Sequence, residues 1–152
     1  ALSLIPPEQR PVVLHQSGAS QIDALRANYE AAGVQADCTP FIEDTATAFA
    51  DADIIVCRAG ASTVTEIAAV GAAAIFVPFP SAVDDHQTTN AQFLVDAGGG
   101  WLVQQRDLTP EGLSQMLLKL ERPALVDIAL KAKNMQKINA TREVVTACEE
   151  LA

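Results

Sequence analysis

Positively charged side chains are scarce in this sequence. Lys and Arg together number 10, against 19 Asp and Glu, which gives a formal net charge of −9. The resulting isoelectric point is near 4.5. A nucleic-acid partner is disfavoured, because phosphate backbones are bound by basic surfaces. Docking of this chain on an anionic membrane is disfavoured for the same reason.

Aromatic residues are also few, at 5%, whereas Ala alone occurs 27 times among 152 residues. Hydrophobic residues make up 49% and charged residues 19%, a composition typical of a folded chain with a sizeable core. Small apolar side chains favour helices packed closely on a sheet over a β-sandwich, which uses more aromatic and β-branched residues. The length fits one domain.

Cysteine is limited to Cys38, Cys57 and Cys148, and no CxxC pair occurs. An odd number without paired spacing predicts buried free thiols in a reducing cytoplasm, not a disulfide framework. No signal peptide is recognisable. The longest nearly apolar run, residues 67–80, is interrupted by a glycine and a proline. It falls short of the ~20 apolar residues of a membrane-spanning helix.

Familiar catalytic and cofactor motifs are missing. Neither GxGxxG nor GKS/GKT occurs, so the usual dinucleotide and P-loop fingerprints are absent. Ser17 lies in the sequence HQSG without a nucleophile-elbow motif, which disfavours hydrolysis by a Ser-His-Asp triad. The two histidines, His15 and His86, are far apart in the sequence, which disfavours a metal site. We therefore expect no metal and no cofactor.

Short apolar runs alternate with segments of helical periodicity along the whole chain. Helices are predicted at residues 20–32, 45–50, 62–70, 85–97 and 110–120, with one or two more from residue 123 onward. Strands are predicted at residues 12–15, 36–42, 53–57, 73–79 and 101–103. Such alternation implies parallel strands joined by right-handed crossovers, and strands without polar alternation imply that both faces are covered. The sequence therefore predicts an α/β fold with one three-layer, doubly wound (Rossmann-like) parallel sheet, as a single domain over residues 1–152.

Polar and glycine-rich segments follow four of the predicted strands. They are residues 15–18, 41–43, 58–63 and, after the fourth strand, 78–80 with 84–87. Loops at the opposite edge are short and less polar. Because open parallel sheets bind ligands at the carboxyl ends of their strands, this asymmetry predicts a ligand site at that edge.

The stretch from Arg58 to Glu66 carries the strongest signal. Gly60 and Ala61 allow a ligand to approach the backbone closely. A helix that opens near Ser62 presents free N–H groups and the positive end of its dipole, which suit a phosphate or diphosphate. Glu66, one turn further, can accept hydrogen bonds from two neighbouring hydroxyls, as on a ribose. The alternative is an ordinary turn with Ser62 as the N-cap and Glu66 as a first-turn acid.

A second cluster, DDHQ, begins at residue 84 and is followed by Asn90. Gln87 and Asn90 are three residues apart and share one helical face, and their amides suit the hydroxyls of a sugar, as does the His86 imidazole. The alternative is a solvated helix start with acidic first residues. The pair Phe41–Ile42 is predicted to end a strand and enter the core, with stacking on a base left open.

Taken together, HQSG, Phe41–Ile42, CRAGASTVTEIAAVG, FVPFP and DDHQTTNA occur in the order found in the MurG family of bacterial glycosyltransferases. From about Val12 onward the chain resembles the C-terminal, donor-binding half of these two-domain GT-B enzymes. The resemblance implies an inverting transfer of GlcNAc from UDP-GlcNAc to lipid I (undecaprenyl-pyrophosphoryl-MurNAc-pentapeptide), which makes lipid II for peptidoglycan. It also implies a peripheral location on the cytoplasmic face of the cell membrane.

The resemblance implies roles for the nucleotide-binding residues. Phe41 and Ile42 would line the uracil site, and the Ile42 backbone would pair with the base. Ala61, Ser62 and Thr63 would present the helix start to the diphosphate, and Glu66 would hold the ribose hydroxyls. Arg58 and Gly60 belong to the loop beneath the phosphates.

The remaining roles concern the donor sugar. His86, Gln87 and Asn90 would face the sugar and the diphosphate, with Gln87 at the GlcNAc hydroxyls. His15 and Ser17 are secondary candidates. Thr89 stands where the family commonly has Lys, which weakens any charge contact there. No catalytic residue is expected in this chain, because the family's general base lies in the other half.

Two family features have no counterpart in this sequence. One is the N-terminal acceptor domain, which would bind lipid I and contact the membrane. The other is the first strand of the donor domain with its GGSQG-type loop, and residues 1–7 match the helix that follows that loop. This strand is central in a doubly wound sheet, so we expect its neighbours to lose their pairing partner. We expect the chain alone to have no transferase activity.

Three alternatives stay open. In the first, the chain is a stand-alone donor-binding subunit that needs a separate membrane-anchored partner, as in the split eukaryotic dolichol-linked GlcNAc transferase. In the second, the donor is a different UDP-sugar. The third alternative is a fragment without affinity for any nucleotide sugar.

Overall fold

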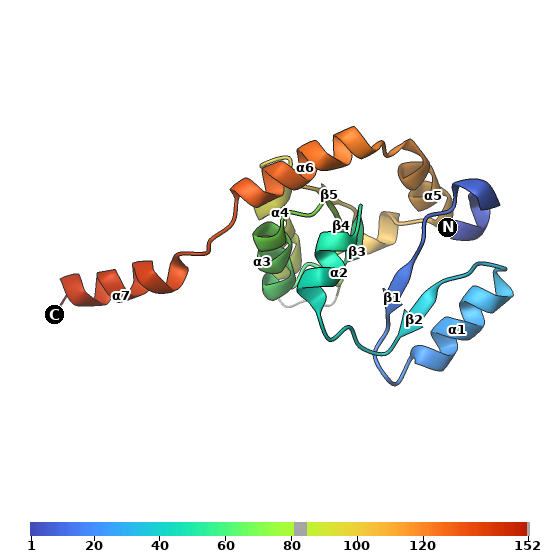
Figure 1. Cartoon of the computed structure of the whole chain (residues 1–152), viewed down its shortest axis with the longest axis horizontal. Helices are drawn as coiled ribbons and strands as arrows, with labels where there is room; N and C mark the ends of the chain where they lie inside the picture. The colour runs from blue at the N-terminus through green and yellow to red at the C-terminus, as the bar shows by residue number, and fades with distance from the viewer. Residues whose placement is uncertain (81–84, 152) are drawn as a thin grey trace. The chain divides into compact units, whose positions relative to one another are not determined.

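The computed structural model describes residues 1–80 and 85–151 (Figure 1). It divides into two compact units, each with its own parallel sheet. The first unit comprises residues 1–48 with 106–120, and the second comprises residues 49–105 with the segment from residue 121 to the C-terminus.

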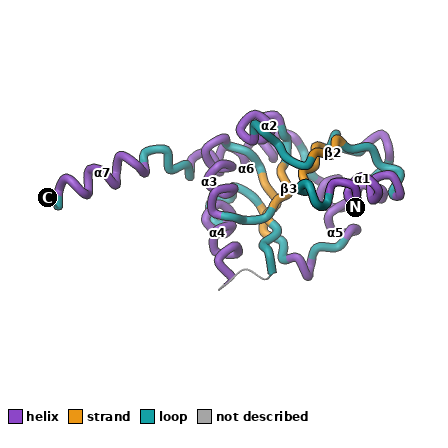
Figure 2. The backbone as a smooth tube through the Cα atoms, turned by 90° about the horizontal axis from the view of Figure 1, so that it is seen from below, coloured by secondary structure: helices purple, strands orange, loops and turns teal. Residues whose placement is uncertain are grey.

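Strands and helices alternate along the described residues, as predicted (Figure 2). The strands are β1 (Leu14–Gln16), β2 (Asp37–Thr39), β3 (Ile55–Cys57), β4 (Ala74–Phe76) and β5 (Trp101–Leu102). The α-helices are α1 (Ile22–Ala31), α2 (Thr45–Asp51), α3 (Ala61–Val70), α4 (His86–Val95), α5 (Pro110–Lys119), α6 (Arg122–Asn134) and α7 (Ala140–Glu150). Short 3₁₀ helices are η1 (Leu2–Leu4), η2 (Pro7–Gln9) and η4 (Gln105–Asp107). The predicted α/β class is confirmed, with shorter strands than predicted.

In the first unit, β1 and β2 pair in parallel, with Leu14 opposite Asp37 and Gln16 opposite Thr39. Helix α1 contacts β2, and α5 contacts η1. The prediction that both faces of the strands are covered is wrong here, because all three residues of β1 are exposed. The apolar run before β1 misled the prediction, since an apolar strand is buried only where a second layer lies on it.

Strand β2 ends at Thr39, before the predicted limit at Ile42. Pro40 has no N–H group to donate to the ladder, so pairing stops there. Phe41 then lies in the following loop with 60% of its surface exposed. The prediction that Phe41 enters the core is therefore wrong, and its ring is available at the surface.

The second unit has a parallel sheet in the order β3-β4-β5. All three residues of the central strand β4 are buried. Helix α3 packs against both α6 and α4, and α4 contacts β5. The core consists mainly of small and branched apolar side chains: Ile55, Ala59, Val64, Ile67, Ala68, Ala72, Ala74, Phe76, Ala91, Leu94 and Ala132. Six of these eleven core residues are Ala.

Close packing in this core requires glycine at one position after α4. A Cβ atom on Gly100 would lie 2.6 Å from the carbonyl oxygen of Ala74 and 3.1 Å from the Phe76 ring. The chain therefore approaches β4 more closely than any other residue would allow.

Two helix starts in the first unit are capped by side chains. The Gly112 N–H donates to Thr109 Oγ1 at 3.0 Å at the start of α5. Asp44 accepts from the Thr47 N–H at 2.9 Å and from the Thr47 hydroxyl at 2.7 Å. Both hydrogen bonds lower the pKa of Asp44, and the bond from the Thr47 backbone N–H contributes more than the bond from the Thr47 hydroxyl.

Among the described residues the strands form two parallel sheets. This agrees with the expectation that the strands on either side of the family's first strand lack a pairing partner. Within the described part of the chain, β1 pairs only with β2, and β3 pairs only with β4. That the family's first strand would pair with β1 and β3 stays a prediction.

The three cysteines are free, as predicted, but not all are buried. Cys148, on α7, is exposed, because no residue of that helix is buried. Cys38 and Cys57 are half-buried, and burial raises the pKa of the Cys57 thiol to about 12. In the described residues, no helix combines the length and apolar character needed to cross a bilayer.

Candidate binding site at the carboxyl ends of the strands

The loops that follow β3 and β4 are joined by hydrogen bonds in the second unit. Gln87, on α4, accepts two of them through Oε1, from the Ala59 N–H at 3.2 Å and from the Phe79 N–H at 2.9 Å. Asn90, one turn later, donates from Nδ2 to the Ala59 carbonyl oxygen at 3.1 Å. The predicted shared face of Gln87 and Asn90 is confirmed, and both side chains fix the loop that leads into α3.

These contacts also determine how the Gln87 amide is oriented. Two backbone N–H groups point at one of its atoms, which must therefore be the carbonyl oxygen. The Nε2 amide hydrogens are left to donate elsewhere. Gln87 can thus offer a ligand hydrogen-bond donors rather than acceptors.

Helix α3 begins one residue earlier than predicted. Its N-cap is Gly60, without a side-chain cap, so the interpretation of Ser62 as the N-cap is wrong. The Val64 N–H donates to the Gly60 carbonyl oxygen at 3.0 Å. The N–H groups of Ala61, Ser62 and Thr63 therefore form the first turn, where a helix has no internal partners for them. This is the geometry in which a helix binds an anion.

Gly60 itself is not required by the fold. Its backbone has φ −62° and ψ 147°, which any residue adopts. A Cβ atom there would meet only Thr63 Oγ1, at 3.8 Å. Glycine at this position therefore leaves room above the helix start that the protein does not use for its own packing.

Glu66 is exposed one turn into α3. It follows Ser62 by four residues and Thr63 by three, so the three side chains share one face of the helix. None of the ion pairs found among the described residues includes Glu66. A carboxylate so placed can accept hydrogen bonds from hydroxyl groups of a ligand that lies at the helix start.

Arg58 lies just before this helix start and is held by several groups. Its Nη1 donates to the carbonyl oxygens of Val77 at 3.2 Å and Pro78 at 3.1 Å. Its Nη2 donates to Gln105 Oε1 at 2.7 Å, and its Cζ lies 5.5 Å from the centre of the Phe79 ring. These contacts join the loops that follow β3, β4 and β5.

The second cluster sits at the start of α4. His86 is the first residue of the helix and is exposed. Asp85, the N-cap, has φ +52°, and its Oδ1 accepts from the Thr88 hydroxyl at 2.7 Å. Thr88 in turn accepts from Gln104 Nε2 at 3.0 Å. Asp84 of the predicted cluster lies outside the described residues.

In the first unit, the loops that follow β1 and β2 also meet, as predicted. The Ile42 N–H donates to Gln16 Oε1 at 2.7 Å. The Ser17 N–H donates to the Thr39 carbonyl oxygen at 3.3 Å, and the Thr39 hydroxyl donates to the Phe41 carbonyl oxygen at 2.8 Å. Phe41 and Ile42 are thus fixed beside the end of β1.

His15 lies within β1, not after it, and contacts α1. Its Nδ1 is 2.9 Å from the Tyr29 hydroxyl, and the two rings meet edge to face with centroids 5.8 Å apart. His15 is exposed as a residue, but partial desolvation of its ring lowers its pKa. Burial, with a smaller contribution from Cys38, raises the pKa of Tyr29. The geometry shows His15 joining helix to strand.

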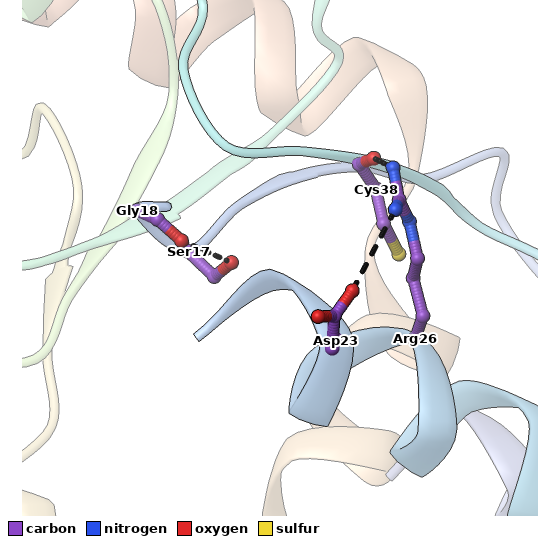
Figure 3. Close-up of polar contacts among 5 residues, drawn as sticks. All are labelled: Ser17, Gly18, Asp23, Arg26 and Cys38. Atoms are coloured by element: carbon purple, nitrogen blue, oxygen red, sulfur yellow. Dashed lines mark hydrogen bonds and ion pairs between the residues drawn. The ribbon is translucent and has the colours of Figure 1, made fainter. Parts of the chain in front are cut away.

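Ser17 and its surroundings are drawn in Figure 3. The Ser17 hydroxyl donates to the Gly18 carbonyl oxygen at 3.3 Å. Nearby, Arg26 Nη2 donates to the Cys38 carbonyl oxygen at 3.3 Å, and its Nη1 lies 4.0 Å from Asp23 (Figure 3). The Ser17 contact is local, and no base for a nucleophile is bonded to it among the described residues.

The sequence did not single out two residues that bond to the predicted site residues, Gln16 in the first unit and Gln105 in the second. Gln16 lies inside the HQSG motif, and only its neighbours His15 and Ser17 were singled out. Gln105 comes directly after the last strand, whose following loop was not compared with the other four. Among the described residues, no group of three or more His, Cys, Asp or Glu side chains is arranged to hold a metal ion.

The fold is that of a Rossmann-like α/β domain, and in each unit the candidate ligand residues follow the carboxyl ends of parallel strands. A model of the glycosyltransferase family 28 C-terminal domain matches residues 5–148. The chain therefore belongs to that family.

Individual relatives agree. The chain is 78% identical over 151 residues to a protein of Paracidovorax citrulli named UDP-N-acetylglucosamine--N-acetylmuramyl-(pentapeptide) pyrophosphoryl-undecaprenol N-acetylglucosamine transferase, covering 99% of this chain and 42% of the relative. It is 76% identical over 152 residues to the protein of the same name from Polaromonas naphthalenivorans, again covering 42% of the relative. The predicted resemblance to the MurG family is thus confirmed, and the chain spans about two fifths of these relatives' length.

Comparison with solved structures also relates this chain to the MurG family. The crystal structure of Acinetobacter baumannii MurG superposes with a TM-score of 0.84 and 46% sequence identity. The match covers 90% of this chain and 42% of that structure.

Proposed function

We propose that this chain binds the nucleotide-sugar donor of a GlcNAc transferase, with UDP-GlcNAc as the donor. The observation that carries the proposal is the start of α3. There the N–H groups of Ala61, Ser62 and Thr63 lie beside a glycine that the fold does not need, and Glu66 follows one turn later. An anion with adjacent hydroxyl groups, such as a ribose diphosphate, matches this arrangement.

The diphosphate is the leaving group in such a transfer. As the acceptor hydroxyl oxygen bonds to the sugar C1 and gives up its proton to a base outside this chain, the bond from C1 to the diphosphate oxygen breaks and negative charge builds up on the leaving phosphate. The N–H groups and dipole of α3 are already oriented toward such a charge and stabilise it without reorganising. This is electrostatic catalysis by the backbone, and it needs no base from this chain.

The sugar and the base would be bound by separate groups. Gln87 would donate from Nε2 to a GlcNAc hydroxyl, since its Oε1 is already bonded to two backbone N–H groups. Asn90 and His86 lie on the same helix and would face the sugar and the diphosphate. Phe41 would stack on uracil, and the Ile42 backbone would pair with it once Gln16 releases the Ile42 N–H.

The acceptor and its general base would belong to the rest of a longer protein. Both relatives are named as transferases to a pyrophosphoryl-undecaprenol acceptor, and this chain spans 42% of each. We therefore propose lipid I as the acceptor, bound by a second domain that also contacts the cytoplasmic face of the membrane. The chain alone should not glycosylate a lipid I analogue, and turnover by it would contradict this division of roles.

Calorimetric titration of the chain with UDP-GlcNAc tests the proposal. We expect binding, and a loss of about tenfold or more in affinity for Glu66→Ala, because two ribose hydroxyls lose their charged acceptor. Glu149→Ala is the matched control, since Glu149 is an exposed carboxylate on α7. UDP-glucose and UDP-galactose, titrated in parallel, test the choice of sugar. Absence of heat with every UDP-sugar would refute the proposal, as would equal affinities of the two variants.

A further inference from the structure

We propose that Gln105 is a positioning residue that holds the Arg58 guanidinium before the start of α3 without neutralising its charge. The inference rests on the proposed diphosphate site and adds to it a residue outside the predicted set. It explains why a neutral amide, and not a carboxylate, accepts the arginine at this edge.

The guanidinium of Arg58 is fixed by three neutral acceptors. Two are backbone carbonyl oxygens, of Val77 and Pro78, and the third is Gln105 Oε1 at 2.7 Å, the shortest of the three contacts. The Phe79 ring lies beside the guanidinium with its centre 5.5 Å from Cζ. No ion pair of the described residues involves Arg58. The positive charge is therefore oriented without a described carboxylate beside it.

Arg58 comes shortly before the start of α3 in the sequence, where a positive charge would favour binding of a diphosphate. Arg58 precedes the N-cap Gly60 by two residues, and the free N–H groups of α3 begin at the next residue, Ala61. The Arg58 guanidinium, held against Val77, Pro78 and the Phe79 ring, would add a full positive charge to the partial charge of the helix dipole. A diphosphate bound at the helix start would be attracted by both.

Gln105 is suited to this role because the loops do not depend on it alone. Gln87 and Asn90 tie the loop after β3 to α4, and Gln87 also ties it to the loop after β4. A change at Gln105 should therefore alter the position or the net charge of the Arg58 group and leave the fold intact.

Two substitutions separate position from charge. Gln105→Glu keeps an acceptor for Arg58 and cancels its charge, whereas Gln105→Leu removes the acceptor and keeps the charge. Gln92→Glu is the control, because Gln92 is exposed on α4 and the change in net charge is the same. Circular-dichroism melts of all variants establish that they are folded.

The test compares affinities for UDP and for uridine by calorimetry. For UDP we expect a loss of about fivefold in Gln105→Glu, the size of one charge interaction near a surface, and about threefold in Gln105→Leu. Uridine lacks phosphate, so its affinity should stay within twofold of wild type in both, and Gln92→Glu should change neither.

Each other result contradicts the inference. Equal losses for UDP and uridine would make Gln105 a merely structural residue, and equal behaviour of Gln105→Glu and Gln92→Glu would remove the role of Arg58. If Gln105→Glu does not fold, the test depends on Gln105→Leu alone: weaker binding of UDP with unchanged binding of uridine would support the inference, and any other result would contradict it. A wild-type chain that binds no UDP would refute the proposed function and this inference with it, whereas wild-type binding with unchanged Gln105 variants would refute the inference alone.

Discussion

Gln16 and Ile42 are joined by a hydrogen bond of 2.7 Å between the Ile42 N–H and Gln16 Oε1. This amide oxygen occupies the backbone group that, by the proposed function, pairs with uracil. An amide carbonyl and a uracil carbonyl are similar acceptors, so Gln16 stands where the base would bind. Base binding must then displace the Gln16 side chain.

Gln16→Leu should therefore tighten UDP binding. The variant leaves the Ile42 N–H without its acceptor in the free chain, so the base no longer competes with a side chain. An exposed hydrogen bond contributes about 0.5–1 kcal/mol, which corresponds to a gain in affinity of about two- to fivefold. Calorimetric titration with UDP measures it. Gln21→Leu, at the N-cap of α1, serves as the control, and weaker binding by Gln16→Leu would show that Gln16 contacts the ligand directly.

Alanine at two glycines should separate function from stability. Gly100→Ala places a Cβ atom 2.6 Å from the Ala74 carbonyl oxygen and should cost about 1–3 kcal/mol in the free energy of unfolding. Gly60→Ala meets nothing closer than 3.8 Å. Its smaller unfolded-state entropy and its poorer N-cap offset each other to within about 0.5 kcal/mol. Gly60→Ala should instead weaken UDP binding about tenfold, because its methyl group projects over the helix start.

Urea unfolding and UDP titration of both glycine variants check this contrast. A strongly destabilised Gly60→Ala, or one that binds UDP as wild type does, would contradict the assignment of this glycine to a ligand. Gly100→Ala with wild-type stability would show that the chain after α4 can move away from β4.

The order of strands and helices could be predicted because its signals are local. Apolar runs, the Thr109 cap and glycines at helix ends are visible within a few residues of each boundary. The hydrogen bonds between the loops after β3 and β4, and between those after β1 and β2, agree with the same order, since the carboxyl ends of parallel strands lie together within one sheet. The start of α3 was displaced by only one residue, from Ser62 to Ala61.

Long-range partners could not be predicted. Nothing local indicates that Gln105 accepts from Arg58, which lies 47 positions earlier in the chain. The exposure of β1 depends on which layers cover it, and its apolar sequence resembles that of a buried strand. Cys148 was expected to be buried for the same reason, because an apolar helix face indicates a contact without showing that one is made.

The His15–Tyr29 contact predicts a pH dependence of stability. Burial lowers the pKa of His15, so the folded chain binds this proton less readily than the unfolded chain, whose histidine titrates near 6.5. The free energy of unfolding should be at its full value above pH 6.5 and should fall as the pH drops below it, because only the unfolded state gains the proton. Protonation also puts hydrogen on both ring nitrogens, so Nδ1 can no longer accept from the Tyr29 hydroxyl.

Urea unfolding at pH 7.5 and pH 5.5 measures this effect against His15→Gln, which should lose the His15 part of the difference. Tyr29→Phe removes the hydroxyl and keeps the titrating ring, so it should be less stable at pH 7.5 and less sensitive to the change in pH. A pH difference unchanged in His15→Gln would assign it to other groups.

Thiol labelling should distinguish Cys148 from Cys57 by accessibility and ionisation. The thiolate is the reactive form, and burial raises the pKa of Cys57 to about 12, so almost none of it is ionised at pH 8. Cys148 is exposed on α7 and should react rapidly with a disulfide reagent. We expect Cys57 to react much more slowly, because it is half-buried and burial keeps its thiol protonated. Cys148→Ser should remove the fast phase and Cys57→Ala should leave it unchanged. Rapid labelling of Cys57 in the folded chain would show that β3 opens to solvent far more often than its place in the core allows.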